Sequence, residues 1–315
     1  MQFSIFLEKF KNIVNPELSG RNLHIQGMKN YSNRLITELI SSEKPFFAGR
    51  FGAYELGVLV NLKDIRINER KNILAYLRGG ETRWWLNKGI LNKFKSNAGF
   101  FPIEEKSLFE YYDLCRADMK EIDLLGSWLH QEKYFLNELL KTKRVLLEDL
   151  DPFFADKPWT MALEGKKVLV VYPFVDEIRN QYSKRDILFE NQLLPQFDLK
   201  VYKPFSLNEA EARFETWFDS LNYMIDEIKE LEFDVALIGA GAYGMNLGAE
   251  LKRYGKQVIH LGGATQLLFG IIGNRWVENP ILNYPIHNLV NDNWVSPYSS
   301  SRPKNFKEIE DGCYW

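Results

Sequence analysis

The sequence has few cysteines, no excess of charge of one sign and no long hydrophobic run. Its two cysteines, Cys115 and Cys313, stand far apart and outside any CxxC or metal-ligand spacing, so they imply neither a zinc site nor a disulfide framework. The formal net charge of -2 combines 40 basic with 42 acidic residues, which disfavours a nucleic-acid partner. No apolar stretch reaches the roughly 18 to 20 residues that span a bilayer.

The amino-terminal stretch MQFSIFLEKFKNIVNPELSG has charges inside its apolar part, unlike a secretory signal. We therefore expect a cytoplasmic protein without a transmembrane segment. Residues 1–28 have the spacing of an amphipathic helical segment, with apolar side chains on roughly one face at Phe3, Ile5, Phe6, Phe10 and Ile13. Docking of this segment on the protein's own core is favoured, and peripheral association with the inner face of the cell membrane is the alternative.

Length and composition are those of an ordinary globular protein. The chain has 315 residues, of which 45% are hydrophobic and 26% charged, enough for a substantial core. We predict one Rossmann-like domain over residues 29–276. Residues 277–315 are rich in Pro, Asn and Ser but also contain Trp and Tyr, so we predict an ordered extension that packs on the domain.

Short apolar runs bounded by Gly, Pro or charged residues, β-branched above all in GKKVLVVYPF, predict buried parallel strands. Five such runs are PFFAGR at 45–50, GKKVLVVYPF at 165–174, FDLKVYKPF at 197–205, FDVALIGAG at 233–241 and KQVIHLGG at 256–263. Residues 29–41 have helical spacing, and the region from about 64 to 147 is mainly helical. The predicted fold is α/β, with a Rossmann-like, mostly parallel sheet, helices on both faces and a helical insertion in the first half.

Gly239, Gly241 and Gly244 match G-x-G-x-x-G directly after a predicted strand and at the start of a helix. In this context backbone N–H groups and the helix dipole hold a phosphate. A nicotinamide site also needs an acid about 20 residues further on, at the end of the next strand. That strand ends in VIHLGG, with His260 and no acid, so we expect a nucleotide or diphosphate ligand and no NAD. The alternative is that the glycines only let a helix pack closely on a strand.

A second glycine turn, LGGATQLLFGIIGNRW, follows at the next strand end. Gly262 and Gly263 form the turn, Gln266 opens the following helix, and Arg275 has the charge to neutralise a phosphate or to cap a helix. A third group, YPFVDEIRNQYSKR, is dense in donors. It offers acceptor or phosphate contacts at Gln181, Tyr182 and Arg185, with His260 beside them, unless the helix is simply solvated.

The stretch FFAGRFGAYELGVL places Arg50, Gly52 and Glu55 at the end of a buried strand. Transfer from a nucleotide donor needs positive charge on the departing diphosphate and a carboxylate that binds metal or deprotonates the acceptor. Arg50 suits the first role, and Glu55 and Asp123, in the companion stretch EIDLLGSW, suit the second. Each of them also suits an ordinary surface ion pair.

The stretch RFGAYE resembles the R-F-G-D-G-E signature of bacterial glycosyltransferases of the GT-D fold class. GAGAYGMNLGAELKRYGKQVIHLGGATQLLFGIIGNRW and the terminal GCYW resemble the carboxyl-terminal core of related proteins from polysaccharide biosynthesis. The resemblance runs with gaps from about residue 30 to the end. It implies transfer of a sugar from a nucleotide-diphosphate donor, a UDP-sugar above all, to an oligosaccharide or lipid-linked glycan in bacterial surface polysaccharide (capsule) biosynthesis.

The resemblance also implies an Asp-x-Glu motif that helps to bind Mn²⁺ or Mg²⁺. Glu55 matches the Glu, whereas Ala53 stands at the Asp position, so metal dependence stays open. The alternatives are a nucleotide-dependent oxidoreductase and a non-catalytic nucleotide- or glycan-binding partner in a polysaccharide assembly complex. We assign catalysis to Glu55, Arg50 and Asp123, and donor binding to Gly52, Gly239, Gly241, Tyr243, Gly244, Gly262, Gly263, Gln266 and Arg275.

Overall fold

The computed structural model describes residues 29–67, 74, 85–153, 155–189, 193–277, 286–303, 306–309 and 312–315. The amphipathic segment expected over residues 1–28 lies outside this range. Among the described residues, no helix is both long and apolar enough to cross a membrane.

Seven parallel strands form one sheet in the order β3-β2-β1-β7-β6-β4-β5. Their bounds are β1 (Phe46–Gly49), β2 (Leu124–Ser127), β3 (Lys143–Leu146), β4 (Lys167–Val171), β5 (Asp198–Tyr202), β6 (Val235–Ile238) and β7 (Gln257–His260). All pairings are parallel, and the register aligns Ile238 of β6 with His260 of β7, so the carboxyl ends of the strands meet at one edge.

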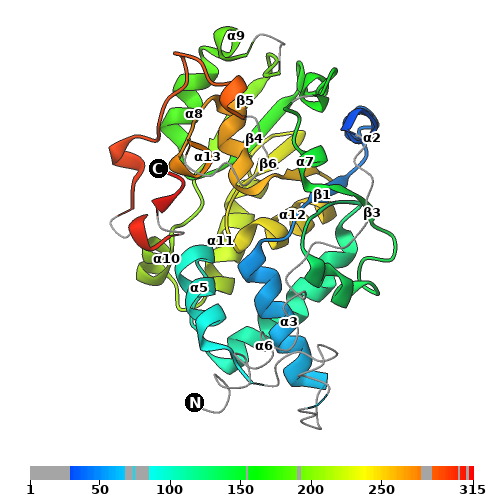
Figure 1. The fold of residues 1–315 in the computed structure, drawn as a ribbon, viewed down its shortest axis with the longest axis vertical. Coiled ribbons are helices and arrows are strands. Elements are labelled where there is room, and N and C mark those ends of the chain that lie inside the picture. The colour runs from blue at the N-terminus through cyan, green and yellow to red at the C-terminus, as the bar shows by residue number, and fades with distance from the viewer. Residues whose placement is uncertain are drawn as a thin grey trace.

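Helices cover both faces of the sheet, as Figure 1 shows. The described α-helices are α2 (Lys29–Ser41), α3 (Ala53–Ile67), α5 (Lys88–Ala98), α6 (Glu105–Asp118), α7 (Leu147–Leu150), α8 (Val175–Tyr182), α9 (Arg185–Leu188), α10 (Leu207–Arg213), α11 (Trp217–Lys229), α12 (Tyr243–Arg253) and α13 (Asn274–Val277). Shorter 3-10 segments include η3 (His130–Phe135), η4 (Trp159–Leu163) and η5 (Gly262–Phe269). The predicted α/β class with a parallel, Rossmann-like sheet is confirmed.

Alternating side chains along the short strands divide the core into two. Phe47 of β1 packs with α3, α5, α6, α11 and α12 on one face, while Phe46 and Ala48 pack with α2, η4, α8 and η5 on the other. Because both faces of β1 are buried, the strand shows a continuous apolar run rather than an alternating one.

The connections that follow β4 and β6 run over opposite faces of the sheet. Helix α8 leads from β4 outward to β5 along the second face, whereas α12 leads from β6 to β7 along the first. β4 and β6 are neighbours, and the connections that leave their carboxyl ends run in opposite directions along the sheet, which makes this a topological switch point. Ligands of open α/β sheets bind in the crevice at such a point.

The region from about 64 to 147 is not wholly helical. It contains α5 and α6, as predicted, but also β2 and β3, which extend the sheet by two strands. Strand β2 has the sequence LLGS, with no β-branched residue and no Gly or Pro before it, so it continues the helical spacing of the preceding residues. The prediction of a mainly helical region was wrong at β2 and β3.

Helix α5 has clear local signals at both ends. The side chain of Asn87 accepts hydrogen bonds from the backbone N–H groups of Gly89 (3.0 Å) and Ile90 (3.3 Å), and Gly99 ends the helix in a left-handed conformation with φ 84°. The helix thereby stops with the Ala98 carbonyl facing the start of α12, where it takes part in the site described next.

Candidate functional site

A pocket of about 810 Å³ lies at the carboxyl edge of the sheet. Its walls come from the ends of β1, β2, β4, β5, β6 and β7, from the end of α5, and from residues 300–303, Ile309, Tyr314 and Trp315. The lining comprises Arg50, residues 52–55, residues 96–99, Trp128, residues 172–174, residues 203–209, Ala212, residues 239–241, Tyr243, His260, Gly262, Gly263, Arg275, residues 300–303, Ile309, Tyr314 and Trp315.

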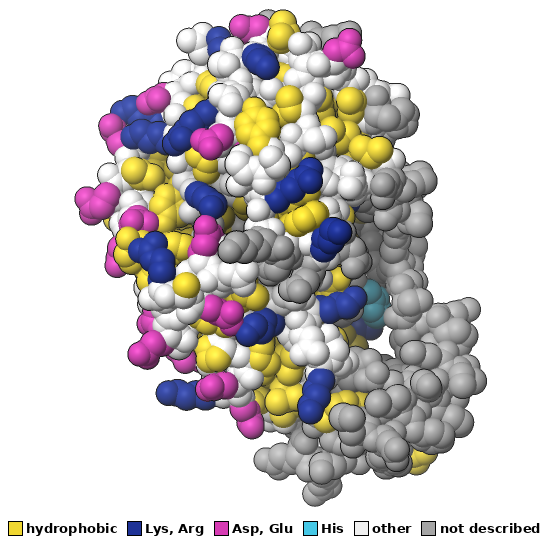
Figure 2. All heavy atoms as spheres, turned by 90° about the vertical axis from the view of Figure 1, so that its left-hand side faces the viewer, with side chains coloured by type: hydrophobic (Ala, Val, Ile, Leu, Met, Phe, Trp, Pro, Cys, Tyr) yellow, Lys and Arg dark blue, Asp and Glu magenta, His cyan; other side chains and the backbone are white. Residues whose placement is uncertain are grey.

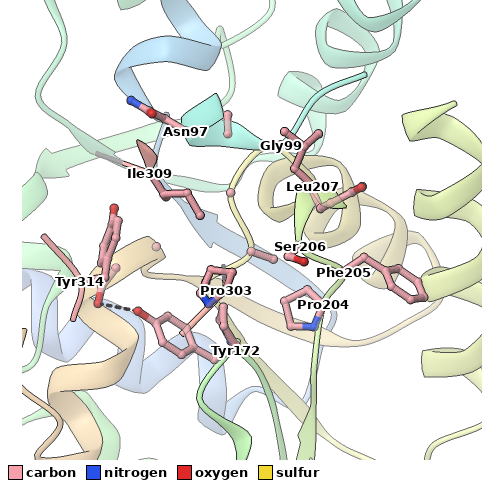
Figure 3. Close-up of a pocket in the computed structure, with 18 of the residues that line it drawn as sticks. Asn97, Gly99, Tyr172, Pro204, Phe205, Ser206, Leu207, Pro303, Ile309 and Tyr314 are labelled. Atoms are coloured by element: carbon pink, nitrogen blue, oxygen red, sulfur yellow. Dashed lines mark hydrogen bonds between the residues drawn. The ribbon is translucent and has the colours of Figure 1, made fainter. Parts of the chain in front are cut away.

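Figure 3 shows the two sides of this pocket. Tyr172 and Tyr314 lie on one side, and Pro204 and Phe205, which follow β5, lie on the other. Figure 2 views the molecule from the side where the carboxyl-terminal segment, α10 and α5 lie in Figure 1. Lys and Arg side chains lie between hydrophobic ones down the middle of this face, and many of its Asp and Glu side chains lie toward one edge. Such a distribution favours the approach of an anion.

Arg50 follows β1 and is held by its neighbours. Its Nε and Nη2 donate to the Phe51 carbonyl at 3.2 and 3.1 Å, and its guanidinium lies 4.8 Å from the centroid of a Trp128 ring. Burial lowers the pKa of Arg50, while the neighbouring Tyr314 and Glu55 raise it and the charge of Arg275 lowers it. An arginine stays protonated in proteins, so the pocket contains a fixed positive charge.

Trp128 is held by a buried carboxylate. Its backbone N–H donates to Glu132 Oε1 at 3.0 Å, and its indole Nε1 donates to the Phe51 carbonyl at 2.9 Å. Glu132 is fully buried and also accepts from Ser127 Oγ at the end of β2. These bonds therefore fix the Trp128 ring against which the Arg50 guanidinium packs. Trp128 was not predicted from the sequence because β2, which it follows, was not predicted.

Gly52 makes room for Glu55. Helix α3 begins at Ala53, and the Glu55 carboxylate folds back so far that a Cβ at Gly52 would overlap it. The carboxylate thus lies at the first turn of a helix, where the helix dipole stabilises negative charge. Arg50, Gly52 and Glu55 line the pocket together, as the sequence predicts.

Three amides at the start of α12 are already bonded within the protein. The N–H of Ala242 donates to the Ala98 carbonyl at 2.9 Å, and those of Tyr243 and Gly244 donate to Ala240 and Gly241 carbonyls at 3.1 Å. One of these bonds therefore goes to the end of α5, and the other two stay within the turn itself. This arrangement leaves no phosphate site of the dinucleotide kind at these three amides.

The three glycines of this motif each allow a close approach of protein atoms. A Cβ at Gly239 would overlap the Tyr172 ring, and one at Gly244 would overlap the His260 ring. Gly241 has φ 51°, and its Cβ would stand 2.8 Å from the Ala98 carbonyl oxygen. Gly239 and Gly241 line the pocket, whereas Gly244 lies beneath His260. Packing alone accounts for the pattern.

His260 ends β7 in the floor of the pocket, 6% exposed. Burial above all, and the charge of Arg50, lower its pKa to about 4, against the opposing effect of the hydrogen bond between Nδ1 and the Ile238 carbonyl. The imidazole is therefore neutral at physiological pH, with Nδ1–H as the donor to this carbonyl.

Two further predicted residues are structural. Gln266 is fully buried, where its Oε1 accepts from the Tyr172 hydroxyl at 2.8 Å and its Nε2 donates to the Ile271 carbonyl at 3.1 Å. Tyr243 lines the pocket, but its hydroxyl is bonded to Ser220 Oγ at 2.7 Å and its ring stacks on Trp217. Gln266 thus positions Tyr172, and Tyr243 belongs to the core.

Asp123 is not brought to the pocket. It precedes β2 at the opposite, amino-terminal edge of the sheet, where its Oδ2 accepts from the Phe47 N–H and pairs with Lys252 Nζ, both at 2.8 Å. A catalytic role beside Glu55 was wrong, because a residue at the start of a parallel strand lies at the far edge from one that follows a strand.

Gln181, Tyr182 and Arg185 also lie outside the pocket lining. The Gln181 amide donates to the Asn293 carbonyl at 2.9 Å, and the Tyr182 hydroxyl accepts from the Phe197 N–H at 2.6 Å. Arg185 reaches Gln196 Oε1 at 3.4 Å. These donors anchor α8 and α9 to neighbouring segments, so the predicted acceptor or phosphate contacts are not made by them.

Comparison with protein-family models, with curated proteins and with solved structures found no match. The resemblance to GT-D glycosyltransferases accordingly rests on the motifs of the sequence, and the site has to be interpreted from its own residues.

Proposed function

We propose that the protein transfers a glycosyl group from a nucleotide-diphosphate sugar to a hydroxyl of a glycan acceptor. The observation that carries this proposal is that Arg50, Arg275 and Glu55 line one pocket at the carboxyl edge of the parallel sheet. Two guanidinium groups suit the two phosphates of a departing nucleoside diphosphate, and one carboxylate suits the proton that the acceptor loses.

In this proposal an acceptor oxygen forms the new bond to the anomeric carbon of the sugar while the bond from that carbon to the diphosphate oxygen breaks. The electron pair of the broken bond leaves with the nucleoside diphosphate, whose charge Arg50 and Arg275 neutralise. The hydroxyl proton of the acceptor passes to Glu55. The aromatic and apolar side chains on the opposite wall, Phe205 among them, offer rings on which a sugar can stack.

The metal ion that the resemblance implies does not fit the residues present. Of the described side chains that line the pocket, the carboxylates are Glu55 of α3 and Glu209 of α10, and Glu209 already bonds Ser206 and Lys203. Among the residues described, no group of three or more His, Cys, Asp or Glu side chains is placed to hold an ion. We derive no step through a metal.

The alternatives rest on single features. A nicotinamide-dependent oxidoreductase is favoured only by the G-x-G-x-x-G pattern, and the bonded amides of α12 weaken that support. A non-catalytic nucleotide- or glycan-binding partner is favoured by Ala53 at the position of the motif's Asp. The acceptor that we propose is an oligosaccharide or lipid-linked glycan of a bacterial surface polysaccharide, with the protein in the cytoplasm or at the inner membrane face.

Thermal-shift titration of the full chain tests the proposal. UDP, GDP, CMP and their common sugars are added with and without Mn²⁺, and NAD serves as the control ligand. Selective stabilisation by one nucleotide diphosphate or its sugar is the expected result, because a ligand that binds only the folded state raises the midpoint. Stabilisation by NAD alone would favour the oxidoreductase, and stabilisation by no nucleotide would refute the donor site.

A further inference from the structure

The last residues of the sequence form part of the wall of the pocket. The backbone N–H of Arg275 donates to the Cys313 carbonyl at 2.7 Å, and its Nη1 donates to the Tyr314 hydroxyl at 3.0 Å. The same guanidinium lies 5.6 Å from the centroid of the Tyr314 ring. Trp315, 8% exposed, packs edge-on against Phe174, so the segment is held by its neighbours on both sides of Tyr314.

The second glycine turn is shaped around Tyr314. A Cβ at Gly263 would stand 2.7 Å from Cε1 of the Tyr314 ring, and one at Gly273 would overlap the Tyr314 carbonyl. Any larger residue at either position would push the tyrosine away from Arg275. Gly263 and Gly273 therefore leave room for Tyr314 of the same protein. This packing explains the two glycines without a ligand.

Both guanidinium groups of the pocket lie near this turn, Arg50 beside Gly262 and Arg275 on Tyr314, which packs against Gly263. Arg50 Nη1 lies 3.5 Å from the Cβ position of Gly262, and the charges of Arg50 and Arg275 are close enough to disfavour one another. Two like charges held in a partly buried pocket are stabilised by an anion between or beside them. The phenolic oxygen of Tyr314 holds the guanidinium of Arg275 in place, because Arg275 Nη1 donates a hydrogen bond to it.

We propose that Tyr314 is a positioning residue of an anion subsite, in which its hydroxyl holds the Arg275 guanidinium so that Arg275 and Arg50 bind the diphosphate of the ligand together. This inference rests on the proposed function for the identity of the ligand. It places the diphosphate beside the turns after β1 and β7 rather than at the first turn of α12. It also gives the carboxyl-terminal segment a role in ligand binding.

Isothermal titration of the full chain with inorganic pyrophosphate, UDP and uridine tests the subsite. Tyr314→Phe keeps the ring and removes the oxygen that Arg275 donates to, so we expect pyrophosphate and UDP to bind roughly tenfold more weakly. Uridine, which has no phosphate, should bind Tyr314→Phe as it binds the unmodified protein. Tyr298→Phe is the matched control, because Tyr298 lies outside the pocket lining and its hydroxyl accepts a 3.2 Å bond from Asn180.

The outcomes separate the subsite from the proposed function. If Tyr314→Phe binds pyrophosphate as tightly as the unmodified protein, or if it loses thermal stability with an unchanged ratio of UDP to uridine affinity, Tyr314 has no positioning role. If the unmodified protein binds neither pyrophosphate nor UDP, the subsite is refuted. Binding of pyrophosphate that depends on Tyr314, without binding of any nucleotide, would keep the subsite and overturn the nucleotide donor.

Discussion

Acidification should destabilise this protein through His260. Its side chain is 6% exposed and its pKa is lowered to about 4, chiefly by burial, whereas a histidine of an unfolded chain titrates near 6.5. The unfolded state therefore binds the proton more readily than the folded state. The resulting stability is fully present above pH 6.5 and is lost progressively as the pH falls toward 4.

The difference between the folded-state and unfolded-state pKa values corresponds to a loss of about 3 kcal/mol of unfolding free energy at low pH, because one pKa unit equals about 1.4 kcal/mol. At pH 5 about 2 kcal/mol of this is already lost, since the unfolded histidine is almost fully protonated there and the folded one is largely neutral. Such a loss is a large share of the about 5 to 15 kcal/mol by which a domain is typically stable.

The comparison of His260→Asn with the unmodified protein isolates this contribution. An asparagine Nδ2 can still donate to the Ile238 carbonyl, which His260 Nδ1 contacts at 3.0 Å, but it does not titrate. The variant will be less stable at pH 7, because a smaller side chain leaves a cavity. Between pH 7 and pH 5 it should lose about 2 kcal/mol less than the unmodified protein, since contributions of the carboxylates cancel.

Urea unfolding followed by tryptophan fluorescence at several pH values gives the two curves of free energy against pH. His130→Asn is the comparison variant, because burial and the charge of Lys133 also lower the pKa of the half-buried His130, and its curve should depart from that of the unmodified protein by less than the curve of His260→Asn. Parallel curves for His260→Asn and the unmodified protein would refute the argument. They would mean that the imidazole is hydrated or protonated in the folded state.

Three other substitutions test the site. Glu55→Gln should abolish glycosyl transfer while leaving the thermal midpoint unchanged, and full activity or failure to fold would contradict the role of Glu55. Gly52→Ala should reduce turnover about tenfold, because the added methyl group displaces the Glu55 carboxylate. The free energy of unfolding should change little, because alanine is accepted at the start of a helix. Unchanged turnover would show that the position of the carboxylate is unimportant. Asp123→Asn should cost about 1 kcal/mol in urea unfolding by weakening the pair with Lys252, with UDP affinity unaltered, and a loss of UDP affinity would restore Asp123 to the site.

Five strands of the sheet were predictable because each is a short, largely apolar run with a Gly, Pro or charged residue at its ends. β4 and β6 are examples, and the helix over residues 29–41 coincides with α2. β2 and β3 were missed for different reasons. β2 has no β-branched residue and no Gly or Pro before it, and β3 lies at the edge of the sheet with a mixed burial pattern, so its sequence contains no continuous core signal.

The site was predictable to the extent that strand ends mark it. Arg50, Glu55 and Gly262 all follow strands of a parallel sheet, and the rule that such ends share an edge places them together. Gln181, Tyr182 and Arg185 were wrongly assigned to the site, because α8 runs away from the carboxyl edge of the sheet after its first turn. Trp128 could be placed in the site only once β2 was known. Tyr314 reaches the site through a contact with Arg275, which is distant in the sequence, and no local pattern contains such a contact.

The glycine pattern after β6 shows why a motif needs its surroundings before it indicates a ligand. G-x-G-x-x-G predicted the strand, turn and helix correctly, since each glycine serves close packing at that turn. Whether a phosphate can bind depends on where the first amides of the helix donate, and here the Ala98 carbonyl at the end of α5 already receives one of them. We therefore propose that the guanidinium groups of Arg50 and Arg275, rather than these amides, recognise the anion. Because side chains bind anions through charge and direction rather than through a preformed ring of amides, this proposal makes the residues that orient the two arginines, Trp128 and Tyr314, part of the specificity of the site.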